Sequence, residues 1–351
     1  MTGVAGLAPS VSDLVRMGPH NGAHRPALRV GLAFLVPNVF LLAIGRPELS
    51  IYATFGVFAS VYGRGLERDS RLHMQTTAGV WFALMVTLGA MLSAMHGSEW
   101  ITIAAIAGCA FGSSVLASVL NWNPGGALFP VFAIGACSAV PTDWPGVGEA
   151  FLVATGAMIV ALLVGLIGNL VGIDPYAHYG RWNPPLATAW ADRTLWRDAV
   201  WVGVAVAIAG VVPYVLGWSH IYWAMVAATA ACTGPNPSAR ILRGVHRIVG
   251  TLIGAVVALG VLHWGLSSWE IVIVACLLQV AAELFVGRNY ALGLVFVTPL
   301  ALMMVQMAHP VAATPLVRDR VIETIVGAAI GIAVMMIVHR LDRRADVPVA
   351  A

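Results

Sequence analysis

The residues best suited to binding chemistry lie in one short turn between two apolar segments in the second half of the chain. Arg288 and Tyr290 stand in this turn, and Thr298 and Pro299 follow partway along the next apolar segment. The proline removes a backbone donor and is expected to loosen the helix there. An arginine, a tyrosine and a weakened helix together predict a polar path through lipid. A tight cytoplasmic turn with one arginine explains the same residues equally well.

Two groups of arginines stand where apolar segments leave the predicted cytoplasmic face. In the second-half group, the spacing i, i+3 and i+7 places all three side chains on one helix face. Guanidinium groups arranged in this way predict an electropositive vestibule that concentrates organic anions and binds their carboxylates bidentately. Anchoring of loops against lipid headgroups explains any single arginine as well. The second-half group is Arg240, Arg243 and Arg247, and the first-half group is Arg64, Arg68 and Arg71.

Two carboxylates lie inside apolar segments, where a lone charge is costly. Glu283 precedes Arg288 by five residues, and Glu323 lies close to Arg320. Each carboxylate is predicted either to form a structural ion pair or to carry a proton that couples to transport. For Glu283 the expected partner is Arg288 or Arg243. We favour the ion pair for both residues.

Further candidate binding residues come from the short apolar segments and from the first half. Tyr222 and Trp223 lie on a short segment, where they would stack on a planar substrate or belong to the interfacial aromatic belt. Asn121 and Asn123 occupy the first-half place that corresponds to Arg288 and Tyr290, so the predicted site is asymmetric.

The histidines and cysteines show no spacing typical of a metal site, and no nucleophile lies beside a base in the pattern. We therefore expect no catalytic residues, no metal and no cofactor, and a protein that is not an enzyme.

The composition indicates an integral membrane protein. The chain has 351 residues, of which 59% are hydrophobic and only 10% are charged. A soluble protein needs far more surface charge than this. The net charge of +3 is too small to argue for nucleic acid as a partner, so the expected partners are the lipid bilayer and a small organic anion.

Apolar segments predict an all-α protein with about twelve membrane spans. A helix needs about 20 residues to cross the hydrocarbon, so the segments at 50–62 and 220–234 are marginal. The predicted organisation is a cytoplasmic tail at 1–24, a six-helix repeat at 25–172, a linker at 173–197, a second repeat at 198–340 and a tail at 341–351. The twelve segments are 27–45, 50–62, 73–95, 100–120, 126–140, 149–172, 198–217, 220–234, 245–266, 269–286, 290–308 and 319–340.

The distribution of arginine predicts the orientation. In this topology all but three of the 19 basic residues, every one of them arginine, fall on one side of the membrane. Arg46, Arg318 and Arg320 fall on the other side. The excess places both termini in the cytoplasm and the protein in the plasma (inner) membrane as a multi-pass protein.

The two halves look like tandem copies. Six spans per half is an even number, so both halves insert the same way, and we expect a pseudo-twofold axis along the membrane normal. The short segments fall at the same place in each half, which points to a transport site; ordinary spans in a thinned bilayer are the alternative. A shift of 172 pairs Arg25 with Arg197, Gly31 with Gly203, Arg68 with Arg240, and Arg71 with Arg243.

Two motifs in the second half resemble those of a known transporter family. The resemblance is to the fusaric acid resistance-like and aromatic acid exporter family of integral membrane bound transporters, here in a short form without a large cytoplasmic domain. The first motif is Arg288-x-Tyr290 followed by Phe296-x-Thr298-Pro299-Leu300. The second is Arg243-x-x-x-Arg247-x-x-Gly250-Thr251-x-x-Gly254.

This resemblance implies efflux of aromatic or other organic acids, driven by the proton gradient. Its motifs match at Arg243, Arg247, Arg288, Tyr290 and Thr298. A passive organic-anion channel and a non-transporting membrane scaffold remain as alternatives. The sequence leaves open whether the protein is a monomer or a homo-oligomer.

Overall fold

The computed structural model describes residues 10–170 and 180–345, and within these ranges the chain is helical without β-strands. The predicted all-α class is therefore confirmed. Parts of the predicted tails and of the linker at 173–197 lie outside the described residues. The helices are α1 Val11–Val15, α2 His24–Ala43, η2 Pro47–Leu49, α3 Ser50–Val57, η3 Phe58–Val61, α4 Arg68–Ala94, α5 Glu99–Val119, α6 Leu128–Ser138, α7 Trp144–Leu170, α8 Leu186–Ala191, α9 Arg193–Val215, α10 Tyr222–Cys232, α11 Pro237–His263, α12 Ser268–Val286, α13 Tyr290–Ala308 and α14 Ala313–Ala345.

Within the described ranges, 9 helices are long and apolar enough to cross a membrane, which supports a multi-pass membrane protein. The other three predicted spans form α3 with 8 residues, and α6 and α10 with 11 residues each. These helices are well short of the roughly 20 residues that a crossing needs. The count of twelve crossing helices therefore stays a prediction. The nine helices are α2, α4, α5, α7, α9, α11, α12, α13 and α14.

Two of the short helices lie entirely inside the protein. Every residue of α3 and of α10 is buried. Helix α3 packs on α7, and α10 packs on α14. Glycines permit both contacts, because a Cβ at Gly56 would overlap the Ala154 carbonyl and one at Gly327 would overlap the Ala224 carbonyl. Close packing through small residues is the usual way in which membrane helices associate.

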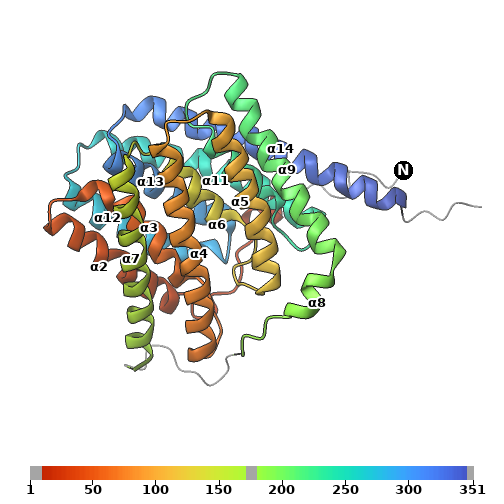
Figure 1. Cartoon of the computed structure of the whole chain (residues 1–351), viewed down its shortest axis with the longest axis horizontal. Helices are drawn as coiled ribbons and strands as arrows, with labels where there is room; N and C mark the ends of the chain where they lie inside the picture. The colour runs from red at the N-terminus through yellow and green to blue at the C-terminus, as the bar shows by residue number, and fades with distance from the viewer. Residues whose placement is uncertain (1–9, 171–179, 346–351) are drawn as a thin grey trace, which may run out of the picture.

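Helices of the first half of the chain pack directly on helices of the second half. Helix α2 of the first half packs on α12 of the second, and α9 of the second packs on α5 of the first. Likewise α3 packs on α13, and α10 packs on α6. Figure 1 shows α7, α4, α5 and α9 running side by side across the molecule. The halves therefore form one bundle, and cavities between them receive side chains from both.

Helix α13 is held close to α11 by glycines of the second family-like motif. A Cβ at Gly250 would lie 2.7 Å from the Leu294 Cβ, and one at Gly254 would lie 2.8 Å from the Thr298 Cβ. The expected weakening at Thr298-Pro299 does not interrupt the helix, since α13 runs as one α-helix through Pro299. Packing against α11 supports it there, as neighbouring helices commonly do around a membrane proline.

The outward faces carry large apolar side chains, as expected for contact with lipid. Leu28 and Leu32 of α2 are 54% and 52% exposed, and Val256 of α11 is 71% exposed. A soluble protein rarely exposes contiguous apolar surface of this kind.

Candidate functional site

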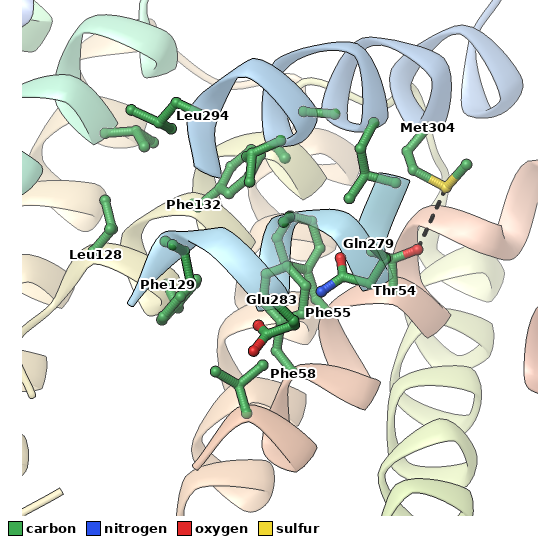
Figure 2. Close-up of a pocket in the computed structure, with 18 of the residues that line it drawn as sticks. Thr54, Phe55, Phe58, Leu128, Phe129, Phe132, Gln279, Glu283, Leu294 and Met304 are labelled. Atoms are coloured by element: carbon green, nitrogen blue, oxygen red, sulfur yellow. Dashed lines mark hydrogen bonds between the residues drawn. The ribbon is translucent and has the colours of Figure 1, made fainter. Parts of the chain in front are cut away.

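An internal cavity lies where the two halves meet. Its walls come from α3, η3 and α6 of the first half and from α10 to α14 of the second. The lining is mostly apolar and rich in phenylalanine, with a cavity volume of about 90 Å³. Figure 2 shows four of these rings, from three different helices, around the same space: Phe55, Phe58, Phe129 and Phe132.

Three arginines line this apolar cavity. Arg243 and Arg247 come from successive turns of α11, and Arg320 comes from α14. The ring of Tyr290 organises the first two. Its centroid lies 4.3 Å from the Arg243 guanidinium carbon, and its hydroxyl accepts a hydrogen bond of 3.1 Å from Arg247 Nη1. The glycine contacts between α11 and α13 allow the tyrosine to come this close.

Arg320 is the most unusual of the three. Its side chain is wholly buried, and none of its three guanidinium nitrogens has a hydrogen-bond partner among the described residues. The guanidinium carbon lies 4.0 Å from the ring centroid of Trp223, which stabilises the cation without neutralising it. A buried charge without a hydrogen-bond partner is costly, which makes this arginine the strongest candidate in the cavity for contact with an anion. The sequence analysis counted Arg320 among the three arginines on the outer side of the membrane, and it did not anticipate that the side chain is buried.

Glu283 lies in the wall of the cavity and forms an ion pair with Arg64. The expected ion pair is therefore present, but the partner is neither Arg288 nor Arg243. Arg64 belongs to the loop after η3 of the first half, so the pair joins the two halves. Figure 2 shows Glu283 and Gln279, one turn apart on α12, reaching towards Phe58 and Thr54 of the first half.

Glu323 lies outside the cavity lining, one turn after Arg320 on α14. Its Oε1 accepts a hydrogen bond of 3.1 Å from the backbone amide of His220, whereas its buried Oε2 has no partner among the described residues. The His220 ring lies 3.1 Å from an oxygen of Asp319. Glu323 thus belongs to a small polar cluster at the beginning of α10, and the structure records no hydrogen bond between it and Arg320.

Arg288 and Tyr290 do not face the same space. Asn289 caps α13 by accepting a hydrogen bond from the Leu292 amide, so the chain changes direction between the two residues. Tyr290 lines the cavity. Arg288 donates from Nε to the carbonyl of Gly18 at 3.2 Å and lines a different pocket. The two residues on which the sequence analysis centred are therefore not brought together.

The remaining candidates also lie outside the cavity lining. Asn121 and Asn123 are exposed in the loop between α5 and α6. Thr298 is buried and faces Gly254 of α11. Tyr222 packs beside Trp223, with ring centroids 4.3 Å apart. Of the predicted binding residues, the structure collects Arg243, Arg247 and Tyr290 around the cavity, with Glu283 in its wall and Trp223 behind Arg320.

Several cavity residues were not among the predicted binding residues: Arg320, Gln279, Phe129 and Phe132. A signal for Arg320 exists in the sequence, since it stands one turn before Glu323 inside an apolar run. Gln279 stands one turn before Glu283 on the same helix, which is also a visible signal.

The second half of the chain, which supplies these arginines, matches a known family. Residues 205–334 match the family model described as fusaric acid resistance protein-like. This part of the chain is therefore similar to that family. The matched range contains Arg243, Arg247, Tyr290 and Arg320, as well as both buried carboxylates. The family resemblance inferred from the motifs is thereby confirmed for this region, and it supports a membrane transporter-like role.

The chain is also similar to an uncharacterized membrane protein of Bacillus subtilis (strain 168), YvaC. The two are 28% identical over 152 residues, which is 43% of this chain and 24% of the relative. The match thus spans about a quarter of that protein's length. No solved structure matches the chain. Within the described ranges, no group of three or more His, Cys, Asp and Glu side chains is arranged to hold a metal ion.

Proposed function

We propose that the protein is a secondary transporter of the plasma membrane that exports aromatic or other amphiphilic organic acids through this cavity. The observation that carries the proposal is the buried guanidinium of Arg320, which has no hydrogen-bond partner among the described residues and lines a cavity walled by phenylalanines. The fusaric acid resistance protein-like region supports a transport role.

The cavity lining combines arginines with apolar rings, and this combination predicts an amphiphilic anion as substrate. A carboxylate placed between Arg320 and Arg247 would receive charge-assisted hydrogen bonds. The apolar part would lie against the rings of Phe55, Phe58 and Phe129, where an aromatic ring gains both buried area and edge contacts. A strongly hydrophilic anion would gain little from those walls. The present cavity has a volume of about 90 Å³, so side chains or helices move when a ring enters.

Transport needs access to the cavity from both sides in turn. The first helix of each half packs on the other half, α2 on α12 and α9 on α5, and these two contacts support the proposed pseudo-twofold relation between the halves. Rocking of one half against the other would alter the cavity, because both halves line it. The arginine distribution supports the proposed orientation with both termini in the cytoplasm.

Proton coupling is proposed for Glu283 and Glu323. Glu283 is suited to it because its carboxylate already lies in the cavity wall against Arg64. Glu323 is suited to it because one of its buried oxygens has no partner among the described residues. Protonation of Glu283 would release Arg64, and protonation of Glu323 would change the field at Arg320, one turn away.

The test is uptake of labelled 4-hydroxybenzoate into inside-out vesicles, with and without an imposed pH gradient. The Arg320→Gln variant should reduce uptake about tenfold or more at equal protein level, because a charged hydrogen bond to the carboxylate is lost. Arg46→Gln is the matched control, since Arg46 is about half-exposed and pairs with Glu48 and Glu149 on the surface.

Four results are informative. Gradient-dependent uptake that falls in Arg320→Gln but not in Arg46→Gln supports the exporter. Saturable uptake that ignores the gradient would favour a passive anion channel along the same arginines. Unaltered uptake in a correctly folded Arg320→Gln variant would remove the cavity from the path, and no uptake of any aromatic acid would favour the scaffold alternative.

A further inference from the structure

A second, strongly basic pocket lies apart from the central cavity, and we call it the basic pocket. It is formed by the N-terminal arm at 19–23, the beginning of α2, the loop after η3, the beginning of α4 and the α12–α13 turn, and its volume is about 620 Å³. Among the described residues that line it, none is Asp or Glu. Its basic lining residues are His20, His24, Arg25, Arg29, Arg64, Arg71 and Arg288.

The basic pocket and the central cavity differ in chemistry. The central cavity combines three arginines with mainly apolar walls, whereas Leu284 is the one large apolar side chain among the described residues that line the basic pocket. Phenylalanines line the first and none lines the second. An amphiphilic monoanion suits the first, and a hydrophilic group with concentrated negative charge suits the second. Arg64 separates the two spaces, because it lines the basic pocket while its partner Glu283 lines the cavity.

Two arginines of the basic pocket carry the argument for a ligand. The structure records no ion pair between Arg25 or Arg288 and any carboxylate of the described residues. Arg288 is held in place by its bond to the Gly18 carbonyl, and the Gly18 amide donates in return to the Arg288 carbonyl at 2.8 Å. Two further arginines, Arg29 and Arg71, are buried at the back of the pocket and have other interactions.

We propose that the basic pocket binds a phosphate group. Planar guanidinium forks match the oxygens of phosphate, and several of them around one pocket suit its concentrated charge. The two histidines of the arm and of α2, whose rings stack at 5.3 Å, add donors at the rim. The phosphate belongs either to an anionic phospholipid or to a soluble phosphate compound.

One feature connects the pocket with lipid. On α2, Arg25 is followed at i+3 and i+7 by Leu28 and Leu32, which share its helix face and are about half-exposed. A phospholipid lying along this face would place its acyl chains on the leucines and its headgroup at Arg25. Basic pockets at the end of membrane helices are known to receive anionic headgroups in this manner.

The experiment measures thermal unfolding of the purified full-length protein in detergent. One series adds inorganic phosphate, with sodium chloride at matched ionic strength as the reference. A second series adds short-chain phosphatidylglycerol, with phosphatidylcholine of the same chain length as the reference. We expect a saturable rise in Tm with phosphate, with phosphatidylglycerol, or with both, and this pattern distinguishes the soluble source from the lipid source.

Variants locate the binding. Arg25→Gln and the double variant Arg25→Gln/Arg288→Gln should weaken binding about tenfold or more, because each removes a charged donor. Arg46→Gln should leave binding unchanged. Loss of Arg288 could loosen the N-terminal arm, so the single Arg25→Gln variant serves as the second test. The Arg25 side chain has no recorded hydrogen bond to any of the described residues, so its replacement should not disturb the arm. Absence of any saturable rise, or equal binding by wild type and Arg25→Gln, would overturn the proposal.

Discussion

Arg64 and Glu283 form an ion pair across the two halves of the chain, between two cavities of different chemistry. Arg64 comes from the loop after η3, and Glu283 comes from α12, 219 positions later. The Glu283 side chain is only 6% exposed, whereas that of Arg64 is 30% exposed. This asymmetry decides how the pair should respond to substitution.

Removal of Arg64 should destabilise the protein more than removal of Glu283. The Arg64→Gln variant leaves a buried carboxylate without its partner, which costs on the order of 3 kcal/mol or more. The Glu283→Gln variant leaves a guanidinium that can reach water, so its cost is smaller. The double variant should be more stable than Arg64→Gln alone. Denaturation of wild type, the two single variants and the double variant in detergent completes a double-mutant cycle. Additive effects on the free energy of unfolding would show that the two residues do not interact.

Tyr290 should contribute to transport through both its hydroxyl and its ring. Tyr290→Phe loses the hydrogen bond from Arg247 but keeps the ring beside Arg243, whereas Tyr290→Leu loses both contacts. If the cavity is the transport site, kcat/KM for uptake should be lower in Tyr290→Phe than in wild type. It should be about fivefold lower again in Tyr290→Leu, as expected for the loss of one cation–π contact. Equal activity of the two variants would show that the ring is dispensable. The uptake assay described above provides the measurement.

Gly250 should be sensitive to any added side chain. A Cβ there would lie 2.7 Å from the Leu294 Cβ, so Gly250→Val should force α11 and α13 apart at a cost of about 1–3 kcal/mol. Gly260 on the same helix has nothing within 4 Å of its Cβ position and provides the matched control. The expected result is a lower Tm for Gly250→Val than for Gly260→Val. Similar values would contradict the close approach of the two helices.

Thr298 should tolerate loss of its hydroxyl. The Oγ1 atom is buried and has no hydrogen-bond partner among the described residues, so Thr298→Val keeps the shape and removes an unsatisfied group. We expect Tm to be unchanged or slightly higher, and the free energy of unfolding to rise by at most about 1 kcal/mol. A clear loss of stability would indicate a partner for this hydroxyl. A loss of transport at normal stability would return Thr298 to the substrate path.

The surface ion pairs of Arg46 should show no pH dependence near neutrality. The carboxylates of Glu149 and Glu48, which accept hydrogen bonds from the Arg46 guanidinium, raise the pKa of Arg46 above its usual range. A raised pKa contributes stability that is fully present below the unfolded pKa and is lost only at higher pH. Thermal unfolding of wild type and Arg46→Gln between about pH 6 and pH 9 should therefore differ by a small, constant amount, as exposed pairs do. A difference that varies across this range would contradict the assignment.

Local patterns in the sequence were enough to predict the class of protein and part of the cavity. Long apolar runs predicted helices in membrane because lipid requires every backbone group to bond within its own segment. The spacing of Arg243 and Arg247 predicted that both side chains share one helix face, and both line the cavity, because helical periodicity acts within a single segment.

Only the tertiary structure showed which distant residues meet. Packing between helices of the two halves pairs Glu283 with Arg64 and buries Arg320 beside Trp223. The helix cap at Asn289 redirects the chain and so separates Arg288 from Tyr290. Residues near in sequence suggested other partners, since spacing along one segment does not specify the segment across from it. The sequence thus determined where the helices form, and packing between helices decided which charged side chains pair and which, such as Arg320, have no hydrogen-bond partner among the described residues.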